Sequence, residues 1–337
     1  QAIKNPASKV TRAASLLNSK NRLCMSGTPL QNNTFDIFAQ MNFLNPGLLG
    51  NMEFFRNEFA TPIDKFGEQE QKEHLRKLLF PFILRRTKEQ VAKDLPEKTE
   101  TILFCEMEKE QRKVYEAYRN SFREKILGTI DQQGIGRSQL TILQGLMKLR
   151  QICDSPAILN EEEKYPNHSI KLDELAREIE ENIGDHKALI FSQFLGMLAL
   201  IKKKLIKDNI PFEYFDGSTS APDREKAIQN FQNNDECRVF LISLKAGGVG
   251  LNLTAADYVY IVDPWWNPAV EQQAIDRTHR IGQTKNIFAY RMICVDTIED
   301  KILQLQEKKR ALVKNLISTE ASFFKSLTQA DVKDLFS

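Results

Sequence analysis

The second half of the chain predicts an α/β fold in which helices cover both faces of a parallel sheet. From about residue 188 onward, short runs rich in β-branched and aromatic residues alternate regularly with helical patterns. Such alternation is typical of parallel sheets with helices on both faces. The strand-like runs are Ala188–Ser192, Phe212–Asp216, Val239–Ser243, Tyr258–Asp263 and Phe288–Ile293. With 337 residues, the chain is long enough for about two domains, each with its own core.

The region before residue 84 predicts a mainly helical part. Helical patterns cover Ser8–Leu17 and the apolar Thr34–Phe43, which Asn45–Gly47 stops. Between them, Arg22–Ser26 predicts a short buried strand that runs into a Gly-Thr-Pro corner. From Met52 to about Phe82 the pattern is a charged helical excursion.

The middle of the chain predicts a connector, a strand and a helical insertion. Leu84–Pro96 is polar and basic at its start, as expected for an interdomain connector. Glu100–Glu106 alternates like a strand, and a helical pattern from Lys109, interrupted by three glycines, resumes over Ser138–Cys153. We therefore predict parts at 1–83, 84–100 (connector), 101–318 with a helical insertion at about 109–158, and 319–337 (tail).

The composition excludes few function classes. With 47 basic and 45 acidic residues the net charge is +2, so nucleic-acid binding would need a locally basic groove. No apolar run approaches the roughly 20 residues of a membrane-spanning helix, and the N-terminus lacks a secretory pattern. We expect a soluble intracellular protein. The five cysteines are scattered, without a Cys-x-x-Cys pair, which predicts reduced core residues and implies neither zinc nor disulfides.

The most informative candidate site consists of Gln273, Arg277 and Arg280. They occupy positions i, i+4 and i+7 of a predicted helix that Asn267 caps and Gly282 stops. This spacing places the amide and both guanidinium groups on one face. Two permanently charged planar groups beside a glutamine suit the γ-phosphate of a nucleotide.

The sequence lacks a loop that would cradle this nucleotide. No glycine is followed by lysine, so the Walker A signature is absent. The glycines of Gly247–Asn252 fit a dinucleotide fingerprint poorly, because Leu253 stands where the third glycine belongs. The arginine motif therefore predicts half of a nucleotide site.

Eight motifs, in this order and with matching spacing, resemble the Swi/Snf family of DNA-translocating ATPases. That family belongs to helicase superfamily two and has two RecA-like lobes. The motifs extend over nearly the whole chain: Ile3–Asn5, Ser26–Asn32, Leu84–Arg86, Leu149–Cys153, Asp216–Thr219, Lys245–Asn252, Asp263–Pro268 and Gln273–Gln283.

The resemblance implies that the chain is the C-terminal portion of a longer protein. Family members often carry Asp-Glu-Ala just before the residues that match Gln1–Asn5, and the Walker A loop lies further upstream. Residues 1–83 would then be the end of the first lobe with a helical protrusion, and 101–318 the second lobe. Asp154–Pro156 departs from the His-Pro of many members, and the end without a reader domain resembles bacterial members.

The resemblance also implies roles in ATP hydrolysis. Arg277 and Arg280 match arginine fingers that reach ATP on the first lobe, and Gln273 would orient water or the γ-phosphate. Gly250 and Asn252 would lie near the nucleotide. The cofactors would be ATP and Mg²⁺, held mainly by first-lobe motifs. The alternative for the arginine pair is a solvated basic helix face.

A second set of residues is expected to contact DNA. Backbone amides at Gly247 and Gly248 together with Lys245 would meet a DNA phosphate, and Ser218 and Thr219 would donate to the same strand. By resemblance, Trp266 touches the tracked strand, and Ser26, Gly27 and Thr28 couple the nucleotide state to DNA contact. Ordinary turns are the alternative for both glycine-containing segments. Contacts with phosphates predict binding that is independent of sequence and sensitive to salt.

These observations predict a parent protein that hydrolyses ATP to move along double-stranded DNA and to remodel protein–DNA complexes without separating the strands. The chain alone is predicted to be inactive as an ATPase. A binding module without catalysis and a strand-separating helicase are the alternatives. The expected partners are double-stranded DNA, the first lobe of the same protein, and DNA-bound proteins or RNA polymerase, with no membrane. The expected location is the bacterial nucleoid in the cytoplasm, or the nucleus of a eukaryote.

Overall fold

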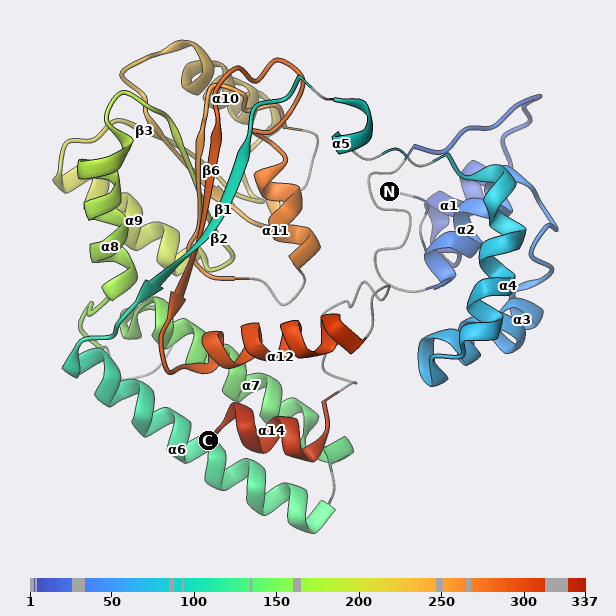
Figure 1. Ribbon diagram of the computed structural model, residues 1–337, viewed down its shortest axis with the longest axis horizontal. Helices are drawn as coiled ribbons and strands as arrows, with labels where there is room; N and C mark the ends of the chain where they lie inside the picture. The colour runs from blue at the N-terminus through green and yellow to red at the C-terminus, as the bar shows by residue number, and fades with distance from the viewer. Residues whose placement is uncertain are drawn as a thin grey trace. The chain divides into compact units, whose positions relative to one another are not determined.

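The computed structural model describes residues 3, 5–25, 34–84, 86, 88–92, 94–133, 135–159, 165–246, 251–264, 268–312 and 327–337 (Figure 1). The chain divides into two compact units, Gln1–Lys93 with Asn315–Ser322 and Asp94–Lys314 with Phe323–Ser337. Each unit is described by itself.

The first unit is helical in the residues that the structure describes. Its elements are α1 (Lys9–Ser15), α2 (Thr34–Leu44), α3 (Met52–Phe55), the π-helical turns η1 (Arg56–Ala60) and η2 (Pro62–Phe66), α4 (Gln69–Leu79), the 3-10 turn η3 (Phe80–Phe82) and α5 (Lys88–Val91). The predicted helices over Ser8–Leu17 and Thr34–Phe43 are confirmed, and the charged excursion is helical. Buried aromatic rings form much of the core of this unit. The ring centroids of Phe38 and Phe55, for example, are 4.8 Å apart.

The predicted buried strand at Arg22–Ser26 is wrong for residues 22–25. They have no regular structure, and Leu23 and Met25 are 81% and 85% exposed. A strand needs a neighbouring strand for its backbone hydrogen bonds, and all strands among the described residues lie between Lys98 and Cys294 in the second unit. Arg22 instead donates to the carbonyl oxygens of Leu17 and Phe43. Ser26, Gly27 and Thr28 lie outside the described residues.

The second unit contains a six-stranded parallel sheet, as the sequence predicts. The strands are β1 (Lys98–Cys105), β2 (Ala188–Ser192), β3 (Phe212–Phe215), β4 (Val239–Ser243), β5 (Tyr258–Ile261) and β6 (Ile287–Cys294). Their order is β1-β6-β5-β2-β4-β3, and all neighbouring pairs are parallel. The first strand, expected at Glu100–Glu106, begins two residues earlier and forms one edge of the sheet.

Helices cover both faces of this sheet because successive strand residues point to opposite sides. Ala188 and Ile190 of β2 join a core with residues of α8 (Ile170–Glu178) and α9 (Leu195–Lys207). The intervening Leu189 joins a second core with residues of α10 (Ala221–Asn233) and α11 (Pro268–Ile275). Short turns η4 (Pro156–Ile158) and η5 (Ile179–Ile183) flank α8. The prediction of helices on both faces is confirmed.

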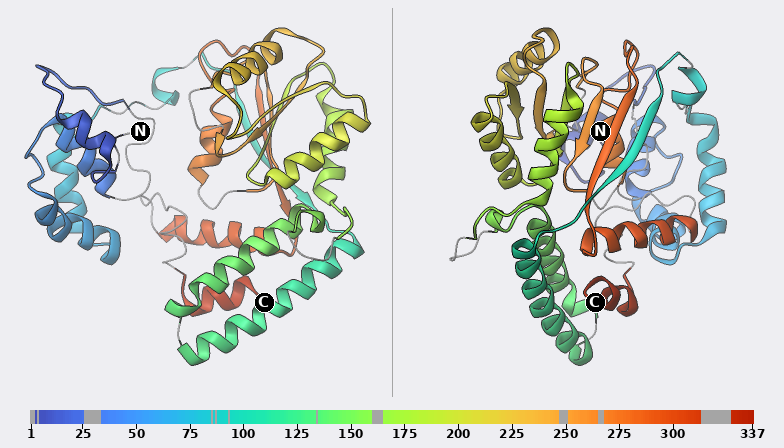
Figure 2. Two further views of the ribbon diagram at one scale, coloured as in Figure 1. Left: turned by 180° about the vertical axis from the view of Figure 1, so that it is seen from behind. Right: turned by 60° about the vertical axis from the view of Figure 1, so that its left-hand side comes forward.

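The helical insertion forms a hairpin of α6 (Lys109–Gln133) and α7 (Ile135–Asp154), against which α12 (Ile298–Leu312) and α14 (Gln329–Leu335) pack (Figure 2). Gly128 does not interrupt α6, because one glycine costs a helix only about 1 kcal/mol relative to alanine. Gly145 permits close packing, since a Cβ there would lie 3.0 Å from side-chain atoms of Phe122 and Phe336. The hairpin therefore joins α14 to the second unit.

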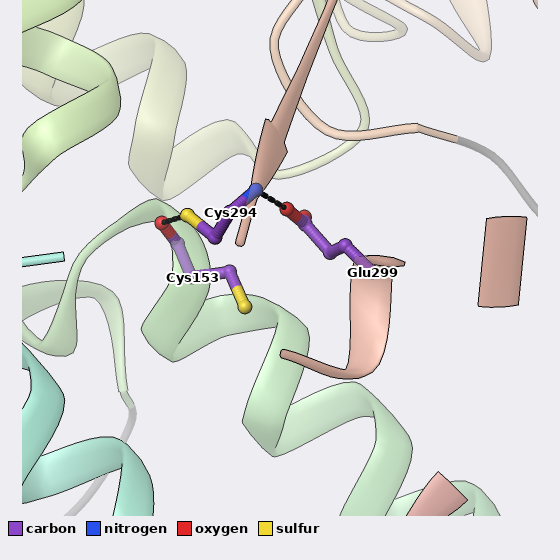
Figure 3. A group of neighbouring side chains, drawn as sticks. All are labelled: Cys153, Cys294 and Glu299. Carbon is purple, nitrogen blue, oxygen red and sulfur yellow. Dashed lines mark hydrogen bonds between the residues drawn. The ribbon is translucent and has the colours of Figure 1, made fainter. Parts of the chain in front are cut away.

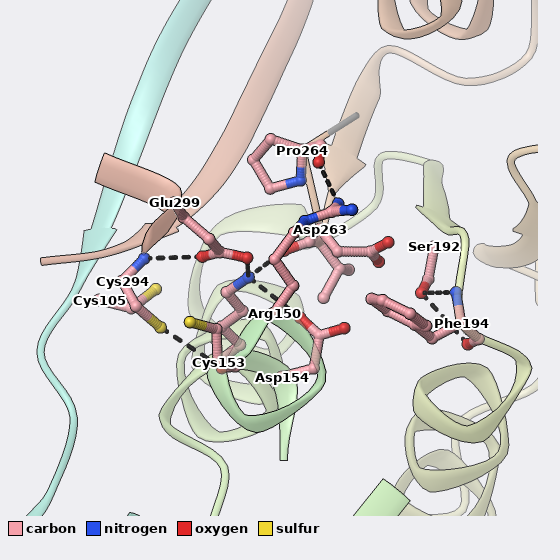
Figure 4. A network of polar contacts seen from close by, with 12 residues as sticks. Cys105, Arg150, Cys153, Asp154, Ser192, Phe194, Asp263, Pro264, Cys294 and Glu299 are labelled. Carbon is pink, nitrogen blue, oxygen red and sulfur yellow. Dashed lines mark hydrogen bonds and ion pairs between the residues drawn. The ribbon is translucent and has the colours of Figure 1, made fainter. Parts of the chain in front are cut away.

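A buried charge network joins the hairpin to the sheet (Figure 4). Lys171, fully buried at the start of α8, donates through Nζ to Asp154 Oδ1 (3.0 Å), Glu299 Oε1 (2.7 Å) and the carbonyl oxygen of Val262 (2.8 Å). Asp154 ends α7, Glu299 lies in the first turn of α12, and Val262 follows β5. Burial lowers the pKa of Lys171, but Glu299 and Asp154 raise it more, so its pKa lies well above the usual value.

We expect Lys171→Met to destabilise the chain by about 3–5 kcal/mol, because it leaves two buried carboxyl groups without their cation. Urea denaturation followed by circular dichroism measures this change. The matched control is Lys204→Met, which removes the partly exposed pair with Asp208 and should cost under about 0.5 kcal/mol. Equal effects of the two substitutions would contradict the assigned role of Lys171.

Candidate functional site

The arginine motif is not one continuous helix. Helix α11 ends at Ile275, so it carries Gln273, while Arg277 and Arg280 lie in the turns that follow. The prediction of a helix through to Gly282, with all three side chains on one face, is therefore wrong. Asn267, its predicted cap, lies outside the described residues.

Side chains within the motif explain why the helix ends. Thr278 Oγ1 donates to the carbonyl oxygen of Ile275 (2.8 Å), Arg280 Nε to that of Asp276 (3.1 Å), and Gln283 Nε2 to that of Thr278 (3.2 Å). These bonds occupy carbonyl groups that a continuing helix would use. Gly282, predicted to stop the helix, lies seven residues beyond its end and has a φ of +100°. We call residues 276–282 the arginine segment.

The arginine segment holds two positive charges close together. Arg277 is buried and Arg280 is half-buried. Burial lowers the pKa of Arg277, the neighbouring charge of Arg280 lowers it further, and Asp276 partly compensates. An arginine remains charged under these conditions. The segment is therefore suited to an anionic ligand that offsets this repulsion.

The structure brings the predicted nucleotide residue Asn252 next to the arginine segment. The backbone N–H of Leu253 donates to the carbonyl oxygen of Arg277 at 3.1 Å, and the exposed Asn252 directly precedes Leu253. Gln232 fixes Asn252 by donating to its carbonyl oxygen at 3.1 Å. Gly250 lies outside the described residues.

Another group of predicted residues lies at the carboxyl end of the sheet. Lys245 follows β4, and Ser218 and Thr219 follow β3. In a parallel sheet these strand ends lie at the same end, where ligands of open α/β sheets commonly bind. The arginine segment lies at the opposite end, because Gln283 donates to the carbonyl oxygen of Ala256 just before β5. Gly247, Gly248 and Trp266 lie outside the described residues.

The hydroxyl groups proposed to contact DNA already have a partner in this structure. Ser218 donates to Asp216 Oδ1 through its N–H (2.8 Å) and its hydroxyl (2.6 Å), and Thr219 Oγ1 accepts from the N–H of Asp216 (3.0 Å). The Ser218 hydroxyl, then the Tyr214 hydroxyl and the Ser218 N–H, all of which donate to the Asp216 carboxylate, lower its pKa to about 2. A phosphate would therefore compete with Asp216 for Ser218, and the DNA role of Ser218 and Thr219 stays a prediction.

Sequence reasoning assigned no role to the charged residues beneath this end of the sheet. Asp263 is fully buried after β5 and accepts from the N–H of Gln193 at 2.8 Å. Arg150, buried near the end of α7, donates to the carbonyl oxygen of Pro264 and lies over the ring of Phe194 (Figure 4). Arg150 lies four residues after Leu146 and three before Cys153, on the apolar face of α7, and a charge on that face is the signal that could have identified it.

Cys153, Cys294 and Glu299 have ligand atoms within 4.8 Å of one another (Figure 3), but this group does not suit a metal. Glu299 already binds the Lys171 ammonium group and accepts from the N–H of Cys294 at 3.1 Å. Burial raises the pKa of Cys294 well above its usual value, so the thiolate that a metal needs is disfavoured. The Cys294 thiol instead donates to the carbonyl oxygen of Cys153. Cys24, predicted to lie in the core, is partly exposed.

Among the described residues, no helix is both long enough and apolar enough to cross a membrane.

Family models match both parts of the chain. The model of the SNF2-related domain matches residues 1–158, and that of the helicase conserved C-terminal domain matches residues 170–282. The fold and these matches define a chain with a RecA-like helicase lobe.

Comparison with a solved structure identifies the family of the chain. The solved SWI2/SNF2 ATPase core of Sulfolobus solfataricus in complex with dsDNA is 39% identical, with a TM-score of 0.61, and the match covers 99% of this chain and 70% of that one. The chain belongs to the SWI2/SNF2 ATPase family.

Two curated relatives show how the chain relates to longer proteins. An uncharacterized ATP-dependent helicase of Mycoplasma genitalium is 38% identical over 100% of this chain and 32% of its own length. The TATA-binding protein-associated factor MOT1 of Saccharomyces cerevisiae is 32% identical over 99% of this chain and 21% of its own length. The chain thus spans about a fifth to a third of the curated relatives it matches, and its bacterial origin stays a prediction.

The Asp263 carboxyl should make stability depend on pH. Burial raises its pKa to about 6, even though Arg150 lowers it, whereas an unfolded aspartate titrates near about 3.9. As the pH rises, the unfolded chain therefore loses this proton before the folded chain does. The stability that the folded chain gains from holding the proton is fully present below about pH 4 and is lost as the pH rises through about 6. We expect the melting temperature of the unsubstituted chain, measured relative to that of the Asp263→Asn variant, to fall between about pH 4 and about pH 6 and then to level off.

Thermal denaturation at about pH 4.5 and about pH 7.5 measures this difference. The matched control is Asp185→Asn, since the Asp185 side chain is 98% exposed. A difference between parent and Asp263→Asn that is the same at both pH values would contradict the raised pKa.

Proposed function

We propose that the protein containing this chain is an ATP-dependent double-stranded-DNA translocase that remodels protein–DNA complexes. The observation that carries the proposal is the arginine segment, which lies beside Asn252 on a RecA-like lobe whose sequence has no phosphate-binding glycine–lysine loop. The DNA complex of the Sulfolobus solfataricus relative supports double-stranded DNA as the partner.

In this proposal Arg277 and Arg280 act on ATP held by a first lobe. Lobe closure brings both guanidinium groups to the γ-phosphate, where they stabilise the charge of the transition state. Gln273, on the preceding helix, orients the attacking water. ATP and Mg²⁺ would be held mainly by the first lobe, as the absence of the Walker A signature from this sequence suggests.

The carboxyl end of the sheet provides the proposed DNA grip. Lys245 is exposed there, and Gly247, Gly248 and Trp266 belong to the segments that follow β4 and β5 in the sequence. Contacts of this type address phosphates and base faces, so they impose no base preference. Alternating open and closed states of the lobes would then move the grip along the DNA. DNA-bound proteins would be the remodelled targets, and the location would follow the DNA, in the nucleoid or nucleus.

A binding module without catalysis is the second candidate, because the sequence lacks the phosphate loop. Mixing this chain with a separately produced first lobe distinguishes the two. Recovery of DNA-dependent ATP hydrolysis supports the catalytic role, and no recovery supports the binding role. Strand separation is a further possible activity. A strand-separating helicase unwinds a forked duplex, whereas a translocase that keeps the strands paired displaces a triplex strand without unwinding the fork.

We expect Arg277→Ala combined with Arg280→Ala, in the longer protein, to lower DNA-stimulated ATP hydrolysis by about 10³-fold or more. DNA affinity, measured by fluorescence anisotropy, should change little, since the arginine segment lies at the other end of the sheet from Lys245. Arg238→Ala, which removes a half-exposed pair with Asp185, is the matched control. If the double variant hydrolysed ATP at the parental rate, the arginine-finger assignment would be wrong.

A further inference from the structure

Arg291 joins three elements around the arginine segment. From the middle of β6, its Nε donates to Glu271 Oε2 on α11 and its NH2 group to Glu100 Oε2 on β1, both at 2.7 Å. The Glu271 side chain is only 4% exposed, and those of Arg291 and Glu100 are 22% and 23% exposed. A guanidinium group that binds two carboxylates in fixed directions sets the relative position of α11 and β1.

The neighbours of Glu100 extend this connection. Lys98 Nζ lies 2.6 Å from Glu100 Oε1. With the Gln272 amide oriented to suit its partners, its nitrogen donates to Glu100 Oε1 (3.2 Å) and its oxygen accepts from Lys98 Nζ (2.7 Å). Gln272, which directly precedes Gln273, is thus bound to the start of β1, and its neighbour Glu271 is linked to β1 through Arg291.

A second attachment holds the arginine segment itself. His279 Nε2 lies 2.9 Å from the carbonyl oxygen of Pro96, and because a carbonyl only accepts, Nε2 carries the hydrogen. His279 stands between Arg277 and Arg280 in the sequence. Pro96 precedes β1 and belongs to the stretch where the predicted connector over 84–100 ends.

We propose that Arg291 and His279 are positioning residues that attach Gln273 and the arginine segment to the chain where the connector ends. This inference rests on the proposed function. A displacement of Pro96–Glu100 is then transmitted to Arg277 and Arg280 by two separate links, one at α11 and one at His279. The connector thereby sets where the guanidinium groups lie when the lobes close.

Apolar packing alone would not fix this position as closely. Ala274 and Ile275 anchor α11 in the core, but apolar contacts are non-directional. Catalytic geometry is far more demanding, since a displacement of about 1 Å can cost about 10²-fold in rate. The polar links supply direction on the side of α11 that faces β1 and β6.

The first test compares Arg291→Met with Arg291→Lys in the longer protein, at saturating DNA. We expect Arg291→Met to lower kcat for ATP hydrolysis by about 10- to 100-fold, with KM for ATP and the Kd for DNA within about twofold of the parent. Arg291→Lys retains the charge without the planar two-carboxylate geometry, so an intermediate kcat is expected. The matched control, Arg238→Met, removes an ion pair at the start of β4 and should leave kcat unchanged.

The second test uses the geometry of the histidine. Glutamine places an N–H donor close to the position of Nε2, so His279→Gln should retain most of the parental kcat. His279→Leu removes the donor and should lower kcat by about 10-fold or more. Equal kcat for the two His279 variants, or an Arg291→Met variant with lower thermal stability but parental kcat, would overturn the inference. If Arg291→Met did not fold, the His279 pair would decide.

Failure of this inference is distinguishable from failure of the proposed function. The Arg277→Ala and Arg280→Ala variant serves as the reference in both tests. If that variant loses hydrolysis while the Arg291 and His279 variants keep it, only the positioning role is wrong. If that variant also keeps hydrolysis, the proposed function of the arginine segment is wrong as well.

Discussion

The structure of the second unit depends on one buried cation. Lys171 binds Asp154, Glu299 and the carbonyl oxygen of Val262, so it fixes the end of α7, the start of α12 and the end of β5 at one point. Two carboxyl groups face this single cation. Burial raises the pKa of Asp154 well above its usual value, although the Lys171 cation lowers it. Pairing with this cation offsets part of the cost of burying the two carboxyl groups.

This arrangement gives the two ends of the sheet different properties. At the carboxyl end, Lys171, Asp263 and Arg150 are buried and bind the backbone just after β2 and β5. At the other end, the links to the arginine segment are partly exposed ion pairs and one histidine hydrogen bond. A single partly exposed ion pair is weaker than a buried one, so the position of the arginine segment depends on these links acting together.

The sequence predicted the sheet well because its central strands β2, β4 and β5 are short apolar runs with clear boundaries. It failed where distant or local hydrogen bonds decide the structure. The helix beyond Ile275 is ended by side chains such as Thr278, which also occur inside helices. The strand at Arg22–Ser26 has the right composition but no neighbour among the described residues. The Lys171 network joins residues separated by 17 and 128 positions, a pairing that no local pattern reveals. The roles of Arg277, Arg280 and Gln273 still rest on the resemblance.

The electrostatics of the arginine segment nevertheless give a physical reason to expect an anion there. The pKa of Arg277 is lowered first by burial and then by the charge of Arg280, so the folded chain bears a cost for keeping both groups charged. A phosphate beside both guanidinium groups would remove the repulsion and add charge-assisted hydrogen bonds. The binding of an anion therefore benefits from a repulsion that the fold maintains in its absence. Arg291 and His279 would maintain this repulsion by holding the arginine segment in place. The positioning of the segment and its affinity for an anion would therefore depend on the same contacts.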